Sequence, residues 1–319
     1  MNFLIPIHIP SLQTPIQHKH QILLTGSCFT EHMSNYLSRA KIRNQHNSHG
    51  IMFNPLSLCV ALQDVIDAKK YAPQDLFFHN EYWHSWNHHS DFSFRDPEQA
   101  IAKINNSIQT QHEFLKQADY LILTLGSAFA YYHLEENRYV SNNHRTPLHG
   151  FRKDLLTAEF MMQELQQCIK RLNNFNPKLQ CIVTISPVRH TRDGVIENNR
   201  SKARLLETVH ALEDIYYFPS YEIMIDVLRD YRFYDSDLVH PNYQATQYIW
   251  EQFLTHCLSS DAKPIIEQCE KLYKALHHKP KDKQSQAHQD FKASNLQLCL
   301  SLKQDYPYIQ LQQEIAYFS

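Results

Sequence analysis

The amino-acid sequence predicts an α/β protein built on a parallel, doubly wound sheet. Three short apolar runs carry this prediction, because 21–26, 119–126 and 179–187 each end at glycine or proline and have the character of buried strands. Longer segments with helical spacing of apolar residues lie between them. Strands that alternate with helices are typical of parallel sheets with helices on both faces. Ligands of such sheets bind at the carboxyl ends of the strands, so functional residues are expected in the loops that follow the three runs.

The first half of the chain gives these elements in a regular order. Basic Lys41 and Arg43 suit the C-terminus of a helix, and Pro55 suits the first turn of the next one. The predicted elements are a strand at 21–26, a helix at 28–43, a helix that begins near Pro55, a loop with a strand pair at 80–96, a helix at 97–116 and a strand at 119–126.

The second half continues the alternation and then changes character. Predicted there are a loop with a hairpin at 131–152, a helix at 153–173, a strand at 179–187, a helix at 199–214, a strand or a strand and turn at 216–226, and a helix after the segment DSDLVHP. From Ala262 the sequence is polar, rich in Lys and Gln and helical in pattern, with a break at 279–283. We therefore expect an α/β domain at 1–260 and a C-terminal helical extension at 261–319.

Composition narrows the classes of partner. The formal net charge is −2, so bulk charge gives no reason to expect nucleic acid as a partner. No apolar run approaches the ~20 residues of a membrane span. The seven cysteines form no CxxC pair, which fits reduced thiols better than a disulfide framework. The N-terminal segment lacks the basic start and long apolar core of a signal peptide. The sequence thus predicts a cytoplasmic protein, and it leaves the oligomeric state open.

Two short motifs can together form an acyl-transfer site. Ser27 lies just past the first strand at the start of a helix, where free N–H groups can stabilise an oxyanion. In DLVH, Asp237 precedes His240 by three residues, so the carboxylate can orient the imidazole and stabilise its charged form. The plainer alternatives are that Ser27 is a helix N-cap and that His240 is a surface residue at the start of a capped helix.

GSCF at 26–29 matches the motif that gives the GSCFA family its name. GIMFNP, WHSWNHHSDFS, LTLGSAFAY, SPVRHTRDGVIENNRSKARLL and YFPSYEIMIDVLRDYRFYDSDLVHP follow in the order of that family. The chain resembles the family from residue 20 to residue 255, and the family is similar to the SGNH/GDSL hydrolases. The resemblance implies a three-layer α/β/α flavodoxin-like sandwich. It also implies Ser27 as the nucleophile, His240 as the base and Asp237 as the acid that orients it.

The oxyanion donors are less well defined than the nucleophile. Where the wider hydrolase pattern has Gly-x-Asn, the segment GSAF places Ala128 at the position of the asparagine. Loss of one such donor raises the barrier to reaction. Besides the backbone of the nucleophile, the candidates are the N–H of Gly50, the side chain of Ser127, and Asn143 or its neighbour Asn142 in the following loop.

Cys28 is the competing nucleophile, because a thiol at a helix N-terminus beside a histidine has a lowered pKa. Consecutive residues point about 100° apart on a helix, so Ser27 and Cys28 are not expected to face the same histidine. The DLVH pair favours Ser27. Cys28 is therefore expected to pack inward as a small hydrophobe.

Other polar residues are expected near the same edge of the sheet. The four histidines between 79 and 89 could bind a metal, but no cysteine accompanies them and packing against their aromatic neighbours is the favoured interpretation. Arg189, His190 and Glu197 follow the strand at 179–187 and could contact an anionic or polyol substrate, or form a solvated loop. The candidates for substrate contact are His84, His89, Arg189, His190 and Glu197.

The sequence therefore predicts a serine hydrolase that cleaves the ester of a small molecule or an acylated carbohydrate through an acyl-Ser27 intermediate, without a metal or cofactor. Two alternatives stay open. One is a non-catalytic binding module of the same fold, which the alanine at position 128 favours. The other is an O-acyltransferase that uses the same residues.

Overall fold

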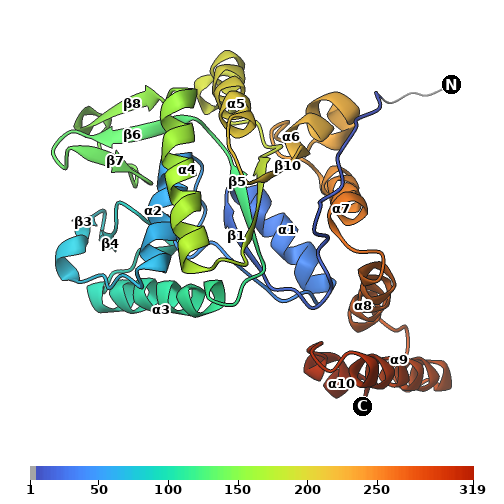
Figure 1. Cartoon of the computed structure of the whole chain (residues 1–319). Coiled ribbons are helices and arrows are strands. Elements are labelled where there is room, and N and C mark those ends of the chain that lie inside the picture. The colour runs from blue at the N-terminus through green and yellow to red at the C-terminus, as the bar shows by residue number, and fades with distance from the viewer. Residues whose placement is uncertain (1–4) are drawn as a thin grey trace.

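The computed structural model describes residues 5–319 and confirms the α/β fold, with a parallel sheet at its centre (Figure 1). The sheet has five strands in the order β10-β9-β5-β1-β2, and every neighbouring pair is parallel. The strands are β1 (Ile22–Gly26), β2 (Asn44–His46), β5 (Tyr120–Leu125), β9 (Gln180–Ile185) and β10 (Tyr216–Phe218). This is the flavodoxin-like strand order when the five strands are numbered by their order along the chain. The chain adds strands on one side of β1 first and then on the other, so the direction of winding reverses between β1 and β5. A ligand crevice is therefore expected where these two strands end.

Helices cover both faces of the sheet, because successive side chains of a strand point to opposite sides. Leu23 of β1 contributes to one core, and its neighbours Ile22 and Leu24 contribute to the other. The covering helices are α2 (Pro55–Ile66), the end of α3 (Pro97–Leu115), α4 (Ala158–Phe175) and α5 (Val195–His210) on one face, and α1 (Cys28–Arg39) and α7 (Tyr243–Cys257) on the other. This arrangement is the three-layer sandwich that the sequence predicts.

The two helix starts that proline marks in the sequence are confirmed. Pro55 occupies the first turn of α2, and the side chain of Asn54 accepts a hydrogen bond from the N–H of Ser57 at 2.9 Å. Pro97 begins α3 in the same way, with Asp96 as the capping residue. A capping side chain satisfies an N–H group that the helix itself leaves free, and proline has no N–H to satisfy.

Two small antiparallel sheets lie beside the central one. The predicted strand pair is confirmed as β3 (Phe77–His79) and β4 (Tyr82–His84). The predicted hairpin is part of a three-stranded sheet, in which β6 (Phe129–His133) lies between β7 (Arg138–Val140) and β8 (Phe151–Leu155). The predicted helix at 153–173 was placed too early, because β8 pairs with β6 and the helix begins only after Thr157, whose hydroxyl accepts from the N–H of Phe160.

The predictions for the fourth apolar run and for the helix before it need correction. The run at 216–226 is a strand for only three residues, because Pro219 has no N–H to continue the ladder. A short helix α6 (Ser220–Glu222) and a π-helical turn at Ile223–Val227 follow. Helix α5 starts earlier than predicted, after Gly194, whose φ is +92°.

The C-terminal extension is helical, as predicted. It consists of α8 (Ala262–Leu276), α9 (Gln286–Asp305) and α10 (Gln312–Phe318), which lie to one side of the sheet in Figure 1. Ala262 and Ile266 of α8 pack with α1 and α7, whereas Cys269 and Leu272 pack with α9 and α10. Helix α8 therefore shares its apolar side chains between the two parts of the chain. The proposed boundary at 260 stays a prediction.

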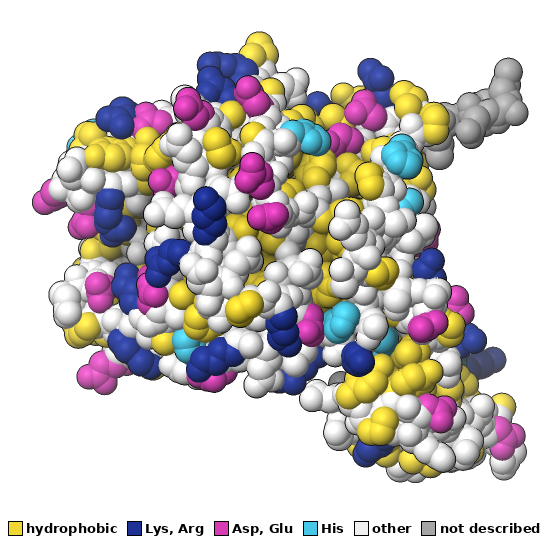
Figure 2. All heavy atoms as spheres, viewed as in Figure 1, with side chains coloured by type: hydrophobic (Ala, Val, Ile, Leu, Met, Phe, Trp, Pro, Cys, Tyr) yellow, Lys and Arg dark blue, Asp and Glu magenta, His cyan; other side chains and the backbone are white. Residues whose placement is uncertain are grey.

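The surface carries mixed charges. On the face that Figure 2 shows, basic and acidic side chains alternate, and the described residues form no extended basic area there. No helix within residues 5–319 is both long and apolar enough to cross a membrane.

Candidate active site

Ser27 lies at the carboxyl end of β1, where the winding of the sheet reverses. It is the N-cap residue of α1, with extended backbone, and its N–H donates to the carbonyl oxygen of Thr124 at 3.2 Å. An N-cap serine ordinarily accepts a helix N–H with its hydroxyl. Here Oγ makes no such bond, and it has no hydrogen-bond partner among residues 5–319 although it is fully buried. The capping role therefore does not explain this hydroxyl.

Gly26 allows β1 and β5 to approach each other directly before the serine. Its φ is +153°, and a Cβ at this position would lie 2.3 Å from the carbonyl oxygen of Thr124. Only glycine accommodates this approach, because any other side chain would collide with the backbone of the neighbouring strand. The predicted role of the glycine at the strand end is thus confirmed in its geometry.

The structure brings Asp237 and His240 together. One carboxylate oxygen of Asp237 lies 2.6 Å from Nδ1 of the imidazole, and the other accepts from the backbone N–H groups of Val239 and His240 at 2.9 and 3.0 Å. The backbone N–H of His240 and then its ring lower the pKa of Asp237 to about 2. The carboxylate is therefore ionised at neutral pH. It holds the proton on Nδ1, which leaves the lone pair of Nε2 available to act as a base.

The loop of this pair is exposed and strained. The side chains of Asp237 and His240 are 49% and 42% exposed. Between them Leu238 has a φ of +57°, a left-handed conformation that is rare for a branched residue. After Pro241, the side chain of Asn242 caps α7 by accepting from the N–H of Ala245 at 3.1 Å. The strained turn is therefore held in place at its C-terminal side by a well-capped helix.

The loop that carries His240 lies against the loop after β9, because the N–H of Arg189 donates to the carbonyl oxygen of Val239 at 3.2 Å. Burial lowers the pKa of His32 on α1, and the charge of His240 lowers it further. Burial, Lys202 and His240 together lower the pKa of His190, after β9, to about 3. The charge of His240 thus acts on groups of both α1 and the loop after β9. Ser27 Oγ and His240 are not hydrogen-bonded in this structure, so the contact between them stays a prediction.

The N–H of Gly50 and the hydroxyl of Ser127, two of the predicted oxyanion donors, already have partners. The N–H of Gly50 donates to the carbonyl oxygen of Asn47 at 2.9 Å and is not available to a ligand in this arrangement. Ser127 Oγ accepts from the N–H of Phe129 and lies 3.2 Å from the hydroxyl of Ser201. Asn143 Oδ1 accepts from the N–H of Arg145 in its own turn. None of these observations supports a role for the three groups as donors.

Asn47 is a donor that the sequence-based interpretation missed. Its Oδ1 accepts the N–H of Gly26 at 2.9 Å, which fixes the amide beside the residue that precedes the nucleophile. Its Nδ2 is buried without an acceptor among the described residues. A buried N–H donor without an acceptor costs free energy. An oxyanion or carbonyl oxygen bound beside Nδ2 would therefore stabilise this amide. One signal for this residue was present in the sequence, namely an asparagine directly after the short segment 44–46. A sharp turn requires a left-handed backbone, which asparagine tolerates, and Asn47 has a φ of +50°.

Cys28 does not have the properties of an activated thiol. Burial raises the pKa of its thiol, although N–H groups at the helix start oppose the rise. The side chain is partly buried, in agreement with the expectation that it packs inward. A thiol with a raised pKa carries little thiolate at neutral pH, which counts against Cys28 as the nucleophile.

The histidines between 79 and 89 belong to a structural layer. His84 uses both ring nitrogens within its own hairpin, towards Ser93 Oγ at 2.7 Å and the carbonyl oxygen of His79 at 3.0 Å. His89 caps the following turn and pairs with Asp91. The histidine, cysteine, aspartate and glutamate side chains described in the structure form no group of three that could hold a metal ion. The substrate-binding roles predicted for His84 and His89 therefore gain no support from their geometry.

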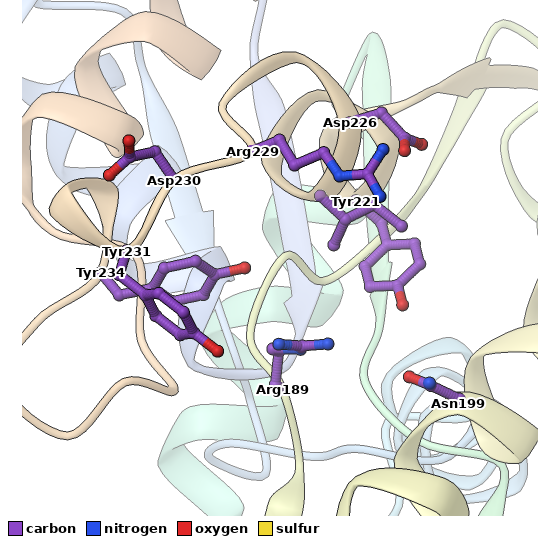
Figure 3. A pocket seen from close by; sticks show the side chains of 9 residues that line it. Arg189, Asn199, Tyr221, Asp226, Arg229, Asp230, Tyr231 and Tyr234 are labelled. Carbon is purple, nitrogen blue, oxygen red and sulfur yellow. The ribbon is translucent and has the colours of Figure 1, made fainter.

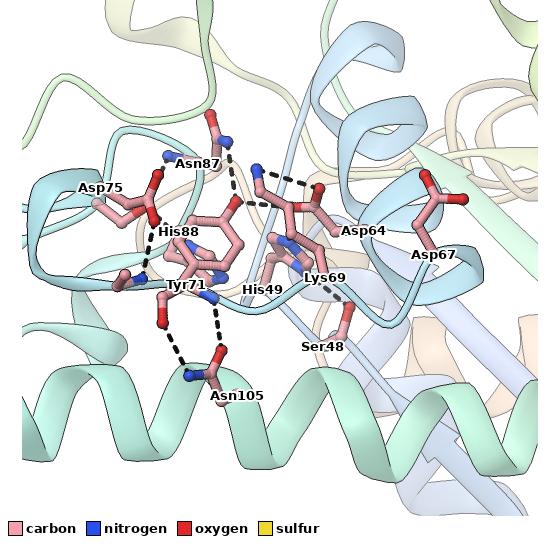
Figure 4. A network of polar contacts seen from close by, with 12 residues as sticks. Ser48, His49, Asp64, Asp67, Lys69, Tyr71, Asp75, Asn87, His88 and Asn105 are labelled. Atoms are coloured by element: carbon pink, nitrogen blue, oxygen red, sulfur yellow. Dashed lines mark hydrogen bonds and ion pairs between the residues drawn. The ribbon is translucent and has the colours of Figure 1, made fainter.

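A buried polar network supports this layer, as Figure 4 shows. Asp64 lies 2.9 Å from His49 Nε2 and accepts the hydroxyl of Tyr71 at 2.6 Å. Ser48 Oγ lies 2.9 Å from the other nitrogen of His49, and the ring of His49 stacks on His88 with 4.1 Å between ring centroids. These residues resemble a serine, histidine and aspartate triad in composition. They lie in the interior, however, and they hold the loop that carries Asn47.

Of the three residues predicted for substrate contact after β9, Arg189 lines a cavity. This cavity of about 430 Å³ is shown in Figure 3. His190 is largely buried, and Nε2 of its ring lies 3.2 Å from the position of a Cβ on Gly126. Glu197 pairs with Arg200 at 2.9 Å on the surface of α5. The structure thus separates the three residues, and Arg189 alone of them contributes to the cavity.

Comparison with known proteins decides the family. A model of the GSCFA family matches residues 21–253. The chain belongs to the GSCFA family. A second model, for the C-terminal domain of GSCFA domain proteins, matches residues 269–319. No curated protein matches this GSCFA protein.

Among solved structures, the GSCFA protein is remotely similar to two esterases. One is a carbohydrate esterase of family 3 from Talaromyces cellulolyticus, at 9% identity and a TM-score of 0.34, with 79% of this chain and 99% of that chain covered. The other is an acetyl xylan esterase, Est2A, from the rumen bacterium Butyrivibrio proteoclasticus, at 10% identity and a TM-score of 0.33, with 82% of this chain and 66% of that chain covered. Both similarities are too remote to assign an activity to this chain.

Lys202 of the GSCFA protein is a second residue that the sequence did not single out. It is fully buried on α5, and Nζ donates to the carbonyl oxygens of Gly126 at 3.0 Å and Ser186 at 2.7 Å. The side chain thereby joins the loops after β5 and β9. Burial lowers the pKa of Lys202 to about 7. In the sequence it looks like any other charged residue of a surface helix, so no signal distinguished it.

Replacing Lys202 is expected to reveal a pH-dependent contribution to stability. The lysine has an ordinary pKa of 10.5 when unfolded and about 7 when folded, so between these values the unfolded chain binds more protons. Stability must therefore rise with pH in this interval. Neutral lysine keeps two N–H donors for the two carbonyls. The free energy of unfolding of the wild type, minus that of Lys202→Met, should increase by up to about 1 kcal/mol per pH unit from pH 7 to 9.5.

Urea denaturation at several pH values measures this difference. Lys170→Met is the matched control, because Lys170 is an exposed lysine of α4 and its replacement should give a difference that stays constant with pH. A constant difference for Lys202→Met as well would contradict the argument.

Proposed function

We propose that this GSCFA protein is a serine esterase in which Ser27 is the nucleophile, His240 the general base and Asp237 the residue that orients it. The observation that carries the proposal is the bond of Asp237 to Nδ1 of His240, which leaves Nε2 free to act as a base. The unpartnered hydroxyl of Ser27 at the reversal point of the sheet supports it. Catalytic hydrogen bonds are often long or absent without substrate, so the lack of a direct Ser27–His240 bond is compatible with this function.

In the proposed reaction, Ser27 Oγ attacks the carbonyl carbon of an ester while Nε2 of His240 takes the hydroxyl proton. The tetrahedral intermediate carries its negative charge on the former carbonyl oxygen. The amide N–H of Asn47 Nδ2 is the donor best situated to stabilise that charge. Collapse breaks the bond to the alcohol, which leaves with the proton held by His240. Water then attacks the acyl-serine with His240 again as base, and the carboxylic acid and free Ser27 are released.

Two observations keep alternative functions in view. Ser27 is fully buried, and position 128 is alanine, as a non-catalytic binding module would permit. If an alcohol replaces water in the second step, the same residues transfer the acyl group to an acceptor.

Labelling by a fluorophosphonate probe, combined with hydrolysis of p-nitrophenyl acetate, separates a catalytic site from a binding module. Product analysis in the presence of a saccharide acceptor separates hydrolysis from transfer.

Asp237→Asn is expected to lower kcat for p-nitrophenyl acetate by about 10³-fold or more. An amide can still accept the backbone N–H groups of Val239 and His240, so the turn is retained. Its NH₂ group, however, would face Nδ1 and move the ring proton to Nε2, which removes the base. The matched control is Asp235→Asn in the same loop, whose side chain makes no bond to His240 and whose replacement should change kcat less than threefold. Equal effects of the two variants would argue against an orienting role.

A further inference from the structure

The cavity in Figure 3 is formed by the segment that leads into the Asp237–His240 loop and by two structures that face it. Arg189 comes from the loop after β9, and Tyr221 from α6. The residues that line the cavity are Arg189, Asn199, Tyr221, Ile225, Asp226, Arg229, Asp230, Tyr231 and Tyr234. A volume of about 430 Å³ lies within the range of small-ligand sites.

The wall of the cavity is continuous with the loop of the proposed base. The N–H of Arg189 donates to the carbonyl oxygen of Val239 at 3.2 Å. Tyr234 pairs with Pro241 in an isolated bridge, and the N–H of Asp235 donates to the carbonyl oxygen of His240 at 2.8 Å. A molecule in this cavity would therefore lie next to His240, where one part of an ester substrate must be held.

Arg189 is half-buried, and one donor of its guanidinium has no partner among the described residues. Its Nε is buried without an acceptor, and no described carboxylate lies within 4.0 Å of its side-chain nitrogens. Figure 3 shows the guanidinium of Arg189 between the side chains of Tyr221 and Tyr234. Burial raises the pKa of both tyrosines, and the charge of Arg189 opposes both rises. Other arginines, such as Arg171 and Arg200, pair with carboxylates on the surface. An acceptor on a bound ligand would satisfy the buried Nε.

The chemistry of the lining selects one class of ligand. The planar guanidinium matches a carboxylate, which it can bind with two parallel hydrogen bonds. Tyrosine faces offer apolar area with a polar edge, which suits a sugar ring. Asp226 and Asp230 are acceptors for hydroxyl groups and repel a multiply charged anion. The cavity therefore combines the guanidinium groups of the half-buried Arg189 and the exposed Arg229 with several acceptors for hydroxyl groups.

We propose that this cavity binds a carboxylate-bearing sugar residue, a uronic acid unit, of an O-acylated saccharide, with Arg189 holding the carboxylate. The assignment rests on the proposed function, because it names the substrate class of that esterase site. The acyl group of such a substrate would extend from the cavity past His240 towards Ser27.

The test compares kcat/KM for an acetylated uronate-containing oligosaccharide with kcat/KM for an acetylated neutral oligosaccharide of the same length. The wild type should favour the acidic substrate by tenfold or more. Arg189→Met should reduce this ratio by about 10- to 100-fold through loss of a charge-assisted bond, and Arg189→Lys should restore part of it. Arg192→Met is the matched control, since Arg192 is exposed nearby and does not line the cavity. It should leave the ratio unchanged.

Binding of unacylated saccharides to the full chain separates this inference from the proposed function. Calorimetric titration should show binding of a uronate disaccharide, weaker binding of the neutral disaccharide, and loss of the difference in Arg189→Met. If this pattern appears without any esterase activity, the cavity assignment stands and the esterase proposal fails. If the wild type hydrolyses esters without preferring acidic saccharides in rate or binding, or binds a sugar phosphate more tightly than the uronate, the inference is overturned.

Discussion

Ser27→Ala is expected to lower the kcat for p-nitrophenyl acetate by at least about 10³-fold and to abolish labelling by a fluorophosphonate. In the proposed reaction this hydroxyl forms the acyl intermediate, so its removal abolishes the covalent route. The protein should remain folded, because Oγ makes no hydrogen bond that the alanine would lose. Unfolding by urea and circular dichroism of the variant verify this point.

Two control variants assign the effect to Ser27. Ser48→Ala removes the serine of the buried Ser48, His49 and Asp64 group, which has the composition of a triad and holds the loop of Asn47 (Figure 4). Cys28→Ala removes the neighbouring thiol, whose pKa burial raises. Both should retain labelling and most of the activity. Loss of labelling in Cys28→Ala but not in Ser27→Ala would instead identify the thiol as the nucleophile.

The features of the fold that sequence predicted are those with a strong local signal. The runs that became β1, β5 and β9 are buried on both sides, so their apolar residues are continuous and easily recognised. Strand β2 was missed because it lies at the edge of the sheet, and its segment 44–46 is short and polar. The strand β8 was assigned to a helix, since its partner β6 is distant in the sequence and a pairing of this kind leaves no local pattern.

Prediction of the candidate site was limited in the same way, because only residues that are close together in the sequence gave a recognisable signal. Asp237 and His240 are three residues apart, so a single turn brings them together and spacing alone predicts the pair. Asn47 and Lys202 act through contacts with Gly26 and Gly126, which fold into place from elsewhere in the chain. A buried lysine and an exposed one have the same appearance in one sequence. The GSCF motif alone does not reveal contacts between segments that are distant in the sequence. The structure supplies them.

Gly26→Ala is expected to destabilise the fold by about 3 kcal/mol or more. The residue has a left-handed φ of +153°, and the new Cβ would lie 2.3 Å from the carbonyl oxygen of Thr124. That oxygen belongs to the backbone of β5, which pairs with Gly26 in the ladder and accepts the N–H of Ser27. It cannot move aside without breaking the pairing of the two central strands, so the cost is not relieved by a side-chain rotation.

Gly150→Ala is the matched control, because a Cβ there would have no atom within 4 Å and φ is not in the left-handed region. Its effect on the free energy of unfolding should stay within about 0.5 kcal/mol. Urea denaturation of both variants measures the difference, and equal stabilities would refute the close approach of β1 and β5 at this point. The carbonyl oxygen of Thr124 also accepts the N–H of Ser27, and the N–H of Gly26 holds the amide of Asn47. A partly folded Gly26→Ala protein should therefore also label more slowly with a fluorophosphonate than its folded fraction accounts for. The glycine before the nucleophile would then be needed both for the stability of the sheet and for the position of the reacting hydroxyl.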